Sequence, residues 1–220
     1  GPATETLRRH CPGRGWYLCD FLDYFPVDAE TFLWGYGSPA NADRDGNLRE
    51  YGGARLAPEA AEIVALTLRE HPLPVLRAMA LNTGRQLVSA ALGDALGSRL
   101  LDQTTGYALR LQFPPAELAR FEAGAQYRGA LPAMARPFAA VLAPVLVASL
   151  ILLALVLARR ASWQHREPIA FVLMVLAGLL GNAFAAGALS GVHDRYQARI
   201  AWLLPLAAAL ALMPARRRLP

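Results

Sequence analysis

Charged residues are missing from three long stretches in the C-terminal part of the chain. None occurs in residues 137–158, 168–192 or 200–215. Soluble core helices normally carry a polar face, and these stretches have none. About 20 apolar residues span the roughly 30 Å hydrocarbon core of a bilayer. The first two stretches are therefore long enough to cross a membrane, and the third is about one turn too short unless Arg199 and Arg216 extend toward the headgroups.

Lysine is absent, and all 22 basic residues are arginine. Residues 1–136 contain 14 arginines and 15 acidic residues, a net charge of −1, whereas residues 137–220 contain 8 and 2, a net charge of +6. The pI of about 9.7 therefore originates in the apolar part. Because the remainder is slightly acidic and has no basic patch interleaved with aromatic residues, the sequence predicts no nucleic-acid partner.

Cysteine is scarce, and the only two are Cys11 and Cys19. No second Cys/His pair has zinc-ligand spacing, so no zinc site is predicted. The two flank Pro-Gly and a second glycine, which allow the chain to fold back. In an oxidising compartment the pair would close a small loop as a disulfide, and two free thiols are the alternative.

Metal-ligating patterns are also incomplete elsewhere. Residues 41–46 begin like a calcium-binding EF-hand loop, but the twelfth position is Gly52, where a bidentate glutamate is required. We interpret this stretch as a solvated turn. The acidic residues Asp20, Asp23, Asp28 and Glu30 show no pairing by spacing and are interpreted as surface charge. The sequence predicts neither a metal nor a cofactor.

The fold class expected from these patterns is mainly α: three transmembrane helices, near 137–158, 168–190 and 199–215, following a mostly helical extracytoplasmic domain with an irregular N-terminal segment. The domains are then residues 1–136 and 137–220. Within the first domain, residues 16–53 are rich in aromatic residues and turn formers and predict short extended pieces and loops. The residue patterns predict helices over 57–71, 74–97 and 114–131, the last of them on the membrane surface.

The arginines predict an orientation. Arg159, Arg160 and Arg166 lie between the first two predicted spans, and three more arginines, residues 216–218, follow the third. By the positive-inside rule these segments are cytoplasmic. Residues 1–136 and the loop at 191–199 would then be extracytoplasmic, in a multi-pass protein of the bacterial inner membrane.

The start of the chain has neither an export signal nor an initiating methionine. We therefore expect the C-terminal part of a longer polytopic protein.

A dense polar cluster stands between the second and third predicted spans. His193, Arg195, Tyr196 and Arg199 occur there together with Asp194 and Gln197. Tyrosine and arginine are common interfacial anchors, so a polar cap on a helical hairpin is one interpretation. The other is a phosphate site, because guanidinium groups suit phosphate geometry. Asn182 in the preceding span predicts an interhelical hydrogen bond.

The stretch HDRYQARIAWLLPLAAALAL, residues 193–212, resembles the last conserved segment of GT-C-type membrane glycosyltransferases. The resemblance implies that His193 and Arg195 help to hold the phosphate of a polyprenyl-phosphate sugar, with the catalytic base elsewhere. It covers about 20 of 220 residues. It departs in spacing, since Pro205 lies ten residues after Arg195 but six after Arg199, and Ile200 is not aromatic.

Two other functions are compatible with these observations. The first is a non-catalytic membrane protein whose extracytoplasmic domain binds an envelope partner. The second is part of a transporter or flippase, which is disfavoured because the predicted spans contain no ionisable residue. In every case the chain would contact membrane lipid.

Overall fold

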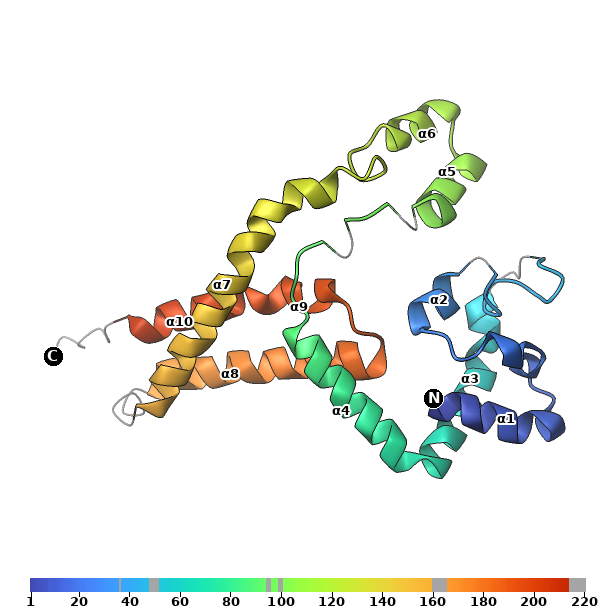
Figure 1. Cartoon of the computed structure of the whole chain (residues 1–220), viewed down its shortest axis with the longest axis horizontal. Helices are drawn as coiled ribbons and strands as arrows, with labels where there is room; N and C mark the ends of the chain where they lie inside the picture. Colours follow the sequence, from blue (N-terminus) through green and yellow to red (C-terminus); the bar gives the residue numbers. More distant parts are fainter. Residues whose placement is uncertain (36, 48–51, 94–95, 99–100, 160–165, 214–220) are drawn as a thin grey trace. The chain divides into compact units, whose positions relative to one another are not determined.

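The described residues of the computed structural model are 1–35, 37–47, 52–93, 96–98, 101–159 and 166–213. They contain helices and no strand, which confirms the predicted mainly α class. The chain divides into two compact units, Gly1–Leu81 and Asn82–Pro220 (Figure 1). This division reflects packing within the chain. The predicted boundary at 136/137 separates an extracytoplasmic domain from a membrane domain, and it stays a prediction.

The first unit begins with a helix where the sequence predicts irregular structure. Helix α1 is Pro2–Arg14, with proline in its first turn and Arg14 in its last, and it ends at Gly15, whose φ of 63° suits glycine. The expected extended pieces of residues 16–53 are also absent from the described residues. They form a 3₁₀ helix, η1 (Tyr17–Tyr24), and the short α2 (Ala29–Trp34). The prediction of extended pieces failed because turn-forming residues and aromatics suit short helices as well, whereas the predicted loops are present in residues 37–47.

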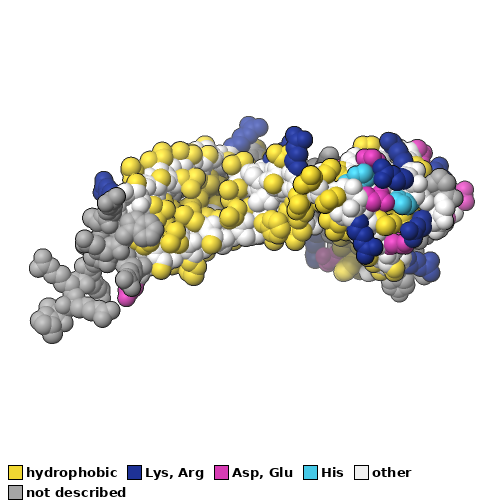
Figure 2. Space-filling view, turned by 90° about the horizontal axis from the view of Figure 1, so that it is seen from below, with side chains coloured by type: hydrophobic (Ala, Val, Ile, Leu, Met, Phe, Trp, Pro, Cys, Tyr) yellow, Lys and Arg dark blue, Asp and Glu magenta, His cyan; other side chains and the backbone are white. Residues whose placement is uncertain are grey.

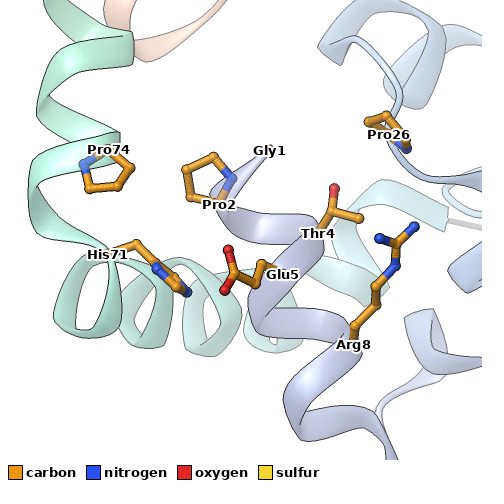
Figure 3. Close-up of a pocket in the computed structure, with 8 residues that line it drawn as sticks. All are labelled: Gly1, Pro2, Thr4, Glu5, Arg8, Pro26, His71 and Pro74. Carbon is orange, nitrogen blue, oxygen red and sulfur yellow. The ribbon is translucent and has the colours of Figure 1, made fainter.

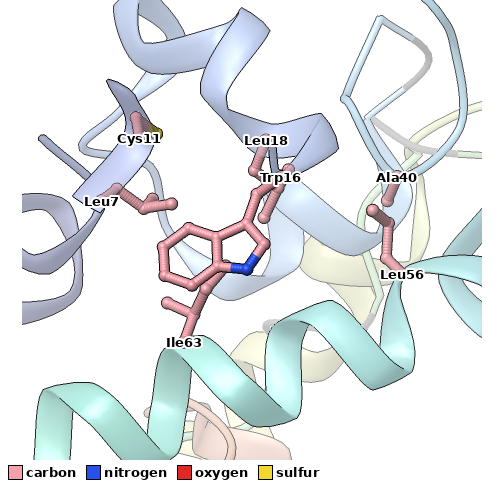
Figure 4. Close-up of a cluster of buried hydrophobic side chains, with 7 residues drawn as sticks. All are labelled: Leu7, Cys11, Trp16, Leu18, Ala40, Leu56 and Ile63. Atoms are coloured by element: carbon pink, nitrogen blue, oxygen red, sulfur yellow. The ribbon is translucent and has the colours of Figure 1, made fainter. Parts of the chain in front are cut away.

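Helix α3 (Gly52–Glu70) confirms the helix predicted over 57–71 and starts five residues earlier. It is followed at once by α4 (Pro72–Val88). The core of the unit forms where α1 and α3 pack around the indole ring of Trp16 (Figure 4). The buried residues of this cluster are Leu7, Cys11, Trp16, Leu18, Ala40, Leu56 and Ile63.

Cys11 and Cys19 are joined in a disulfide, with 5.1 Å between their Cα atoms. The bridge ties the end of α1 to η1, next to the Trp16 cluster. Of the two predicted alternatives, a disulfide and two free thiols, the structure contains the disulfide.

The helix predicted over 74–97 is shorter in the structure, because α4 ends at Val88. After it come a π-helical turn η2 (Asp102–Gly106), α5 (Tyr107–Gln112) and α6 (Pro115–Glu122). The helix predicted over 114–131 accordingly ends at Glu122. Turns occupy residues 123–129, where Gly129 has a φ of 69°.

Two helices of the second unit are long and apolar enough to cross a membrane. Helix α7 (Leu131–Ala158) and helix α8 (Arg166–Ala183), which continues through the π-helical η4 (Phe184–Ala188), cover the first two predicted spans. Their most apolar windows have mean hydropathies of 2.9 and 2.2 and are only 17% and 28% buried. Core helices of soluble proteins are mostly buried, so the exposed apolar surface is that expected of helices facing lipid. Hydrophobic side chains dominate the visible face of these helices (Figure 2).

The prediction of a third span is wrong for the described residues. This stretch is divided at Trp202 between two short helices, α9 (Asp194–Ala201) and α10 (Leu203–Leu212). The break has a covalent cause: Pro205 has no N–H to donate to the carbonyl of Ala201, the last residue of α9. At about 1.5 Å per residue, the ten residues of α10 cover roughly half of the hydrocarbon thickness.

Helix α10 nonetheless packs as the third member of an apolar bundle with α7 and α8. The buried residues at their meeting point are Leu153, Val172, Val175, Leu179, Leu204, Ala207 and Ala208. The remaining arginines of the orientation argument, Arg160 and residues 216–218, lie outside the described residues, as do the connecting segment 160–165 and the chain beyond 213.

Candidate functional site

Helix α9 carries all four residues predicted to bind a lipid phosphate. His193 is its N-cap residue, with extended backbone angles, and Arg195, Tyr196 and Arg199 lie within the helix. Because positions three and four apart share a helix face, the three side chains that follow His193 fall around one side. The structure therefore brings the predicted residues together.

Tyr196 lies at the centre of this group. The guanidinium carbons of Arg195 and Arg199 are 5.0 and 6.0 Å from the centroid of its ring, within cation–π range. The His193 ring meets the same ring edge-on, with 5.3 Å between centroids. Arg199 is exposed and the other three are partly buried. We call Arg195, Tyr196 and Arg199 the cationic face of α9.

The opposite side of α9 is held by buried amides. Gln197 is 2% exposed, and its Nε2 donates to the carbonyl of Leu179 on α8 at 3.3 Å. Asn182 on α8 donates through Nδ2 to Gln197 Oε1 at 2.8 Å and to the Tyr196 carbonyl at 3.2 Å. The predicted interhelical role of Asn182 is confirmed. These bonds fix the rotation of α9 and so direct the cationic face away from α8.

Gln86 is a positioning residue that the sequence analysis did not identify. Its side chain is fully buried, and it forms two 2.9 Å bonds with the backbone of His193: Nε2 donates to the carbonyl and Oε1 accepts from the N–H. The end of α4 approaches η4 closely here, since a Cβ on Gly187 would lie 2.6 Å from the Asn82 carbonyl oxygen. Gln86 is 107 positions from His193, and no local pattern links two such distant residues.

The acidic residue of the cluster has a backbone partner. Asp194 Oδ1 accepts a hydrogen bond from the N–H of Ala91 at 3.2 Å. That contact ties the start of α9 to the segment after α4. Asp194 therefore acts as a structural anchor in this arrangement.

An apolar groove of about 380 Å³ runs beside α9. One wall is the stripe of α7 from Ala139 to Leu150, and Gln197 and Ala201 of α9 contribute to the other. Successive helix residues are about 100° apart, so Arg195 and Arg199 lie about 160° around the helix from Gln197. The groove and the cationic face are therefore on opposite sides of α9, and the groove contributes no residue to the cationic face.

The first unit has a separate hollow of about 600 Å³ (Figure 3). Its lining residues are Gly1, Pro2, Thr4, Glu5, Arg8, Pro26, His71 and Pro74. Beside it, Glu70 accepts from His10 at 2.5 Å and from Arg9 at 3.4 Å. The hydrogen bond from His10 is the main cause that holds the pKa of Glu70 below its ordinary value of 4.5, with smaller contributions from the nearby charges of His10, Arg9 and His71.

Two of the acidic residues interpreted as surface charge, Asp23 and Asp28, have local structural partners, as does Asp43 in the predicted turn. Asp28 caps α2 through Thr31, whose N–H and hydroxyl donate to it at 2.9 and 2.6 Å, and these bonds lower the pKa of Asp28. Asp23 pairs with Arg44. Asp43 accepts from the backbone of Asp45 and Asn47, as in a solvated turn. No group of metal-ligating side chains that could hold an ion occurs in the described residues.

The chain matches no protein-family model, no curated protein and no solved structure.

Proposed function

We propose that the protein is an integral membrane protein that binds the phosphate of a lipid-linked substrate on the cationic face of α9. The observation that carries the proposal is the pair of guanidinium groups at 5.0 and 6.0 Å from the Tyr196 ring. Two forks on one helix face can donate several charge-assisted hydrogen bonds to a single phosphate. The apolar helices α7 and α8 supply the membrane setting in which such a phosphate is attached to a lipid.

The rigid backing of α9 supports a binding function rather than a simple polar cap. An anchor for the headgroup region needs no fixed orientation, because arginine and tyrosine adapt to the interface. Here Gln86, Asn182 and Gln197 hold the helix with five hydrogen bonds to side chains or backbone. Asp194 adds a sixth. Such preorganisation reduces the ordering cost of binding.

The resemblance to GT-C-type glycosyltransferases extends this proposal to a reaction class. In it the substrate is a polyprenyl-phosphate sugar, and α9 faces the outside of the bacterial inner membrane. His193 and the cationic face would hold the phosphate, and, as the resemblance implies, the base would be contributed by another part of the protein.

The test compares binding of a polyprenyl phosphate and of the corresponding polyprenol to the purified protein in lipid nanodiscs. The Arg195→Gln, Arg199→Gln double variant should raise the Kd for the phosphate at least about tenfold, since one hydrogen bond to a charged group contributes about 1.5–3 kcal/mol. Binding of the polyprenol should not change.

The matched control is Arg159→Gln, which removes the same charge just after the C-terminal end of α7. The part of α7 that lines the groove beside α9 ends at Leu150, nine positions earlier. The control should bind like the wild type. Equal binding by the double variant and the wild type, or an equal loss in the control, would contradict the phosphate site.

A second candidate function is partner binding by the first unit. The observation in its favour is the hollow of about 600 Å³ on a unit that has its own buried core and disulfide. A pull-down in which Arg8→Glu abolishes capture of an envelope protein, while the cationic-face double variant retains it, would favour this function over the first.

A further inference from the structure

Helix α3 carries an uninterrupted apolar strip on the side that faces away from α1. Residues at steps of three, four and seven share one helix face. The strip, called the α3 stripe here, consists of Ala54, Ala57, Pro58, Ala61, Val64, Ala65 and Leu68. All seven are exposed, Val64 by 55% and Leu68 by 46%. The other side of the helix supplies Leu56 and Ile63 to the core, so the stripe is additional to the face that folding requires.

The acidic residues of α3 are paired with α1 and η1. Each of Glu59, Glu62 and Glu70 has a partner there, and Glu62 is itself exposed. Glu59 accepts from the N–H groups of Tyr17 and Leu18 at 2.8 and 2.9 Å. Glu62 accepts from Arg14 at 2.7 Å and from the indole N–H of Trp16 at 3.0 Å. Glu70 accepts from His10 and Arg9.

The arginines of α3 have no such partners. Arg55 and Arg69 are exposed, and neither forms an ion pair with any described residue. By helix geometry both lie about 80–120° to one side of Ala61, at the same edge of the stripe as Glu62, whose charge is paired with Arg14. The stripe is thus bordered along one edge by two arginines, while each glutamate of the helix has a partner on α1 or η1.

We propose that α3 lies on the membrane surface, with its stripe in contact with acyl chains and with Arg55 and Arg69 binding acidic lipid headgroups. An apolar face flanked by arginine is the composition of interfacial helices, and arginine stems reach from apolar surface to the headgroups. The charge pattern selects an anionic lipid surface as the occupant, because a protein partner would need no excess of cations along the edge. The proposal rests on the membrane setting given by α7 and α8 and is independent of phosphate binding by α9.

The test uses the full chain reconstituted in vesicles that contain anionic lipid. Single cysteines are introduced as Val64→Cys on the stripe and Asp45→Cys as control, and each is labelled with an environment-sensitive fluorophore. The native cysteines do not react, because they form the disulfide. The control position, Asp45, is exposed. It follows Ala42, whose carbonyl accepts a hydrogen bond from the Tyr17 hydroxyl, and the N–H of Tyr17 donates to Glu59. Position 45 therefore lies on the Glu59 side of α3, away from the stripe.

Nitroxide-labelled lipids should quench the fluorophore at position 64 several-fold more strongly than the one at position 45. Replacing the anionic lipid with a zwitterionic one, or adding salt, should reduce quenching at position 64. A second stripe variant, Ala61→Cys, should behave like Val64→Cys. A stripe fluorophore that is quenched no more than the control overturns the proposal. Protection from an aqueous quencher without quenching by the lipid also overturns it and identifies a protein, including a second copy, as the occupant.

A fluorophore at Val147→Cys separates this outcome from failure of the membrane setting itself. Val147 is 56% exposed in the middle of α7 and should be quenched strongly by the same lipids. Strong quenching at position 147 with none at position 64 removes the α3 proposal and leaves the membrane setting intact. Absence of quenching at both positions removes both.

Discussion

Individual residues of α9 divide between two roles. Gln197 is buried and bonded on both ends of its amide, whereas Arg199, two positions later, is exposed beside the Tyr196 ring. Removing a buried amide leaves its partners without hydrogen bonds, which costs about 1–3 kcal/mol. Removing an exposed guanidinium costs little stability. Substitutions at the two positions should therefore separate folding from ligand binding.

Glu70 makes the first unit sensitive to acid. Its pKa is held below the ordinary 4.5, first by the hydrogen bond from His10. A carboxyl whose pKa is lower in the folded state stabilises the fold above the ordinary pKa and loses that contribution as the pH falls through the folded value. We predict that the denaturant concentration at the unfolding midpoint of the first unit decreases as the pH is lowered below 4.5. The Glu70→Gln variant should show a smaller decrease.

The measurement is denaturant unfolding followed by hydrogen exchange of α1 and α3 at several pH values. Glu117→Gln is the control, because this residue forms only an exposed pair with Arg120 in the second unit. A Glu70→Gln profile that stays parallel to the wild type below pH 4.5 would count against the role of Glu70.

At the scale of elements, the contact between α4 and η4 leaves no room for a Cβ at Gly187. A Cβ on Gly187 would lie 2.6 Å from the Asn82 carbonyl oxygen and 2.7 Å from Gln86 Cβ, whereas a Cβ on Gly181 would meet nothing within 4 Å. We predict that Gly187→Ala destabilises the protein by about 1–3 kcal/mol through overpacking. Gly181→Ala should stabilise it by up to about 1 kcal/mol through helix propensity.

Thermal unfolding of both variants in nanodiscs provides the comparison. Because Gln86 holds the backbone of His193, Gly187→Ala should also weaken phosphate binding. Similar melting temperatures for the two alanine variants would show that α4 and η4 do not pack as closely as described.

At the scale of the whole molecule, the two units have separate cores, and the disulfide belongs to the first. Closing a loop between Cys11 and Cys19, eight positions apart, contributes about 2–3 kcal/mol in the chain-entropy account. We predict that reduction, or the Cys11→Ser, Cys19→Ser double variant, destabilises the first unit by this amount.

Hydrogen exchange with and without reductant measures the effect in each unit. Protection should fall in α1, η1 and α3 and should stay unchanged in α7 and α8. An equal loss of protection in the bundle would mean that the two units unfold as one cooperative body.

The outcome of the sequence predictions depended on the range of the interactions involved. Helices α7 and α8 were predictable because apolar composition and length are properties of a continuous stretch. The third span failed at Pro205, where one missing N–H outweighs the apolar composition around it. The helix over Pro2–Arg14 was missed because its polar, glycine-containing sequence has no strong apolar periodicity, and its stability comes from packing Leu7 and Cys11 against α3.

The candidate site was predictable in part for the same reason. His193, Arg195, Tyr196 and Arg199 are neighbours along the chain, so helix geometry alone groups them. The groups behind them come from α8 and from α4, and the distance of Gln86 from His193 along the chain leaves no trace in the local pattern. Asn182 was identified because an amide is conspicuous within an apolar run.

The amino-acid sequence by itself determined where the chain is apolar enough to cross a membrane, which residues gather at the start of α9 and which two cysteines were available to pair. These are properties of composition and of spacing over a few residues. Only the tertiary structure decided that α10 packs on α7 and α8, that buried amides orient the cationic face, and that the acidic residues of α3 pair with α1 and η1. Each of these depends on contacts between distant segments, which form only when burial and hydrogen bonding together outweigh the entropy of ordering the chain between them.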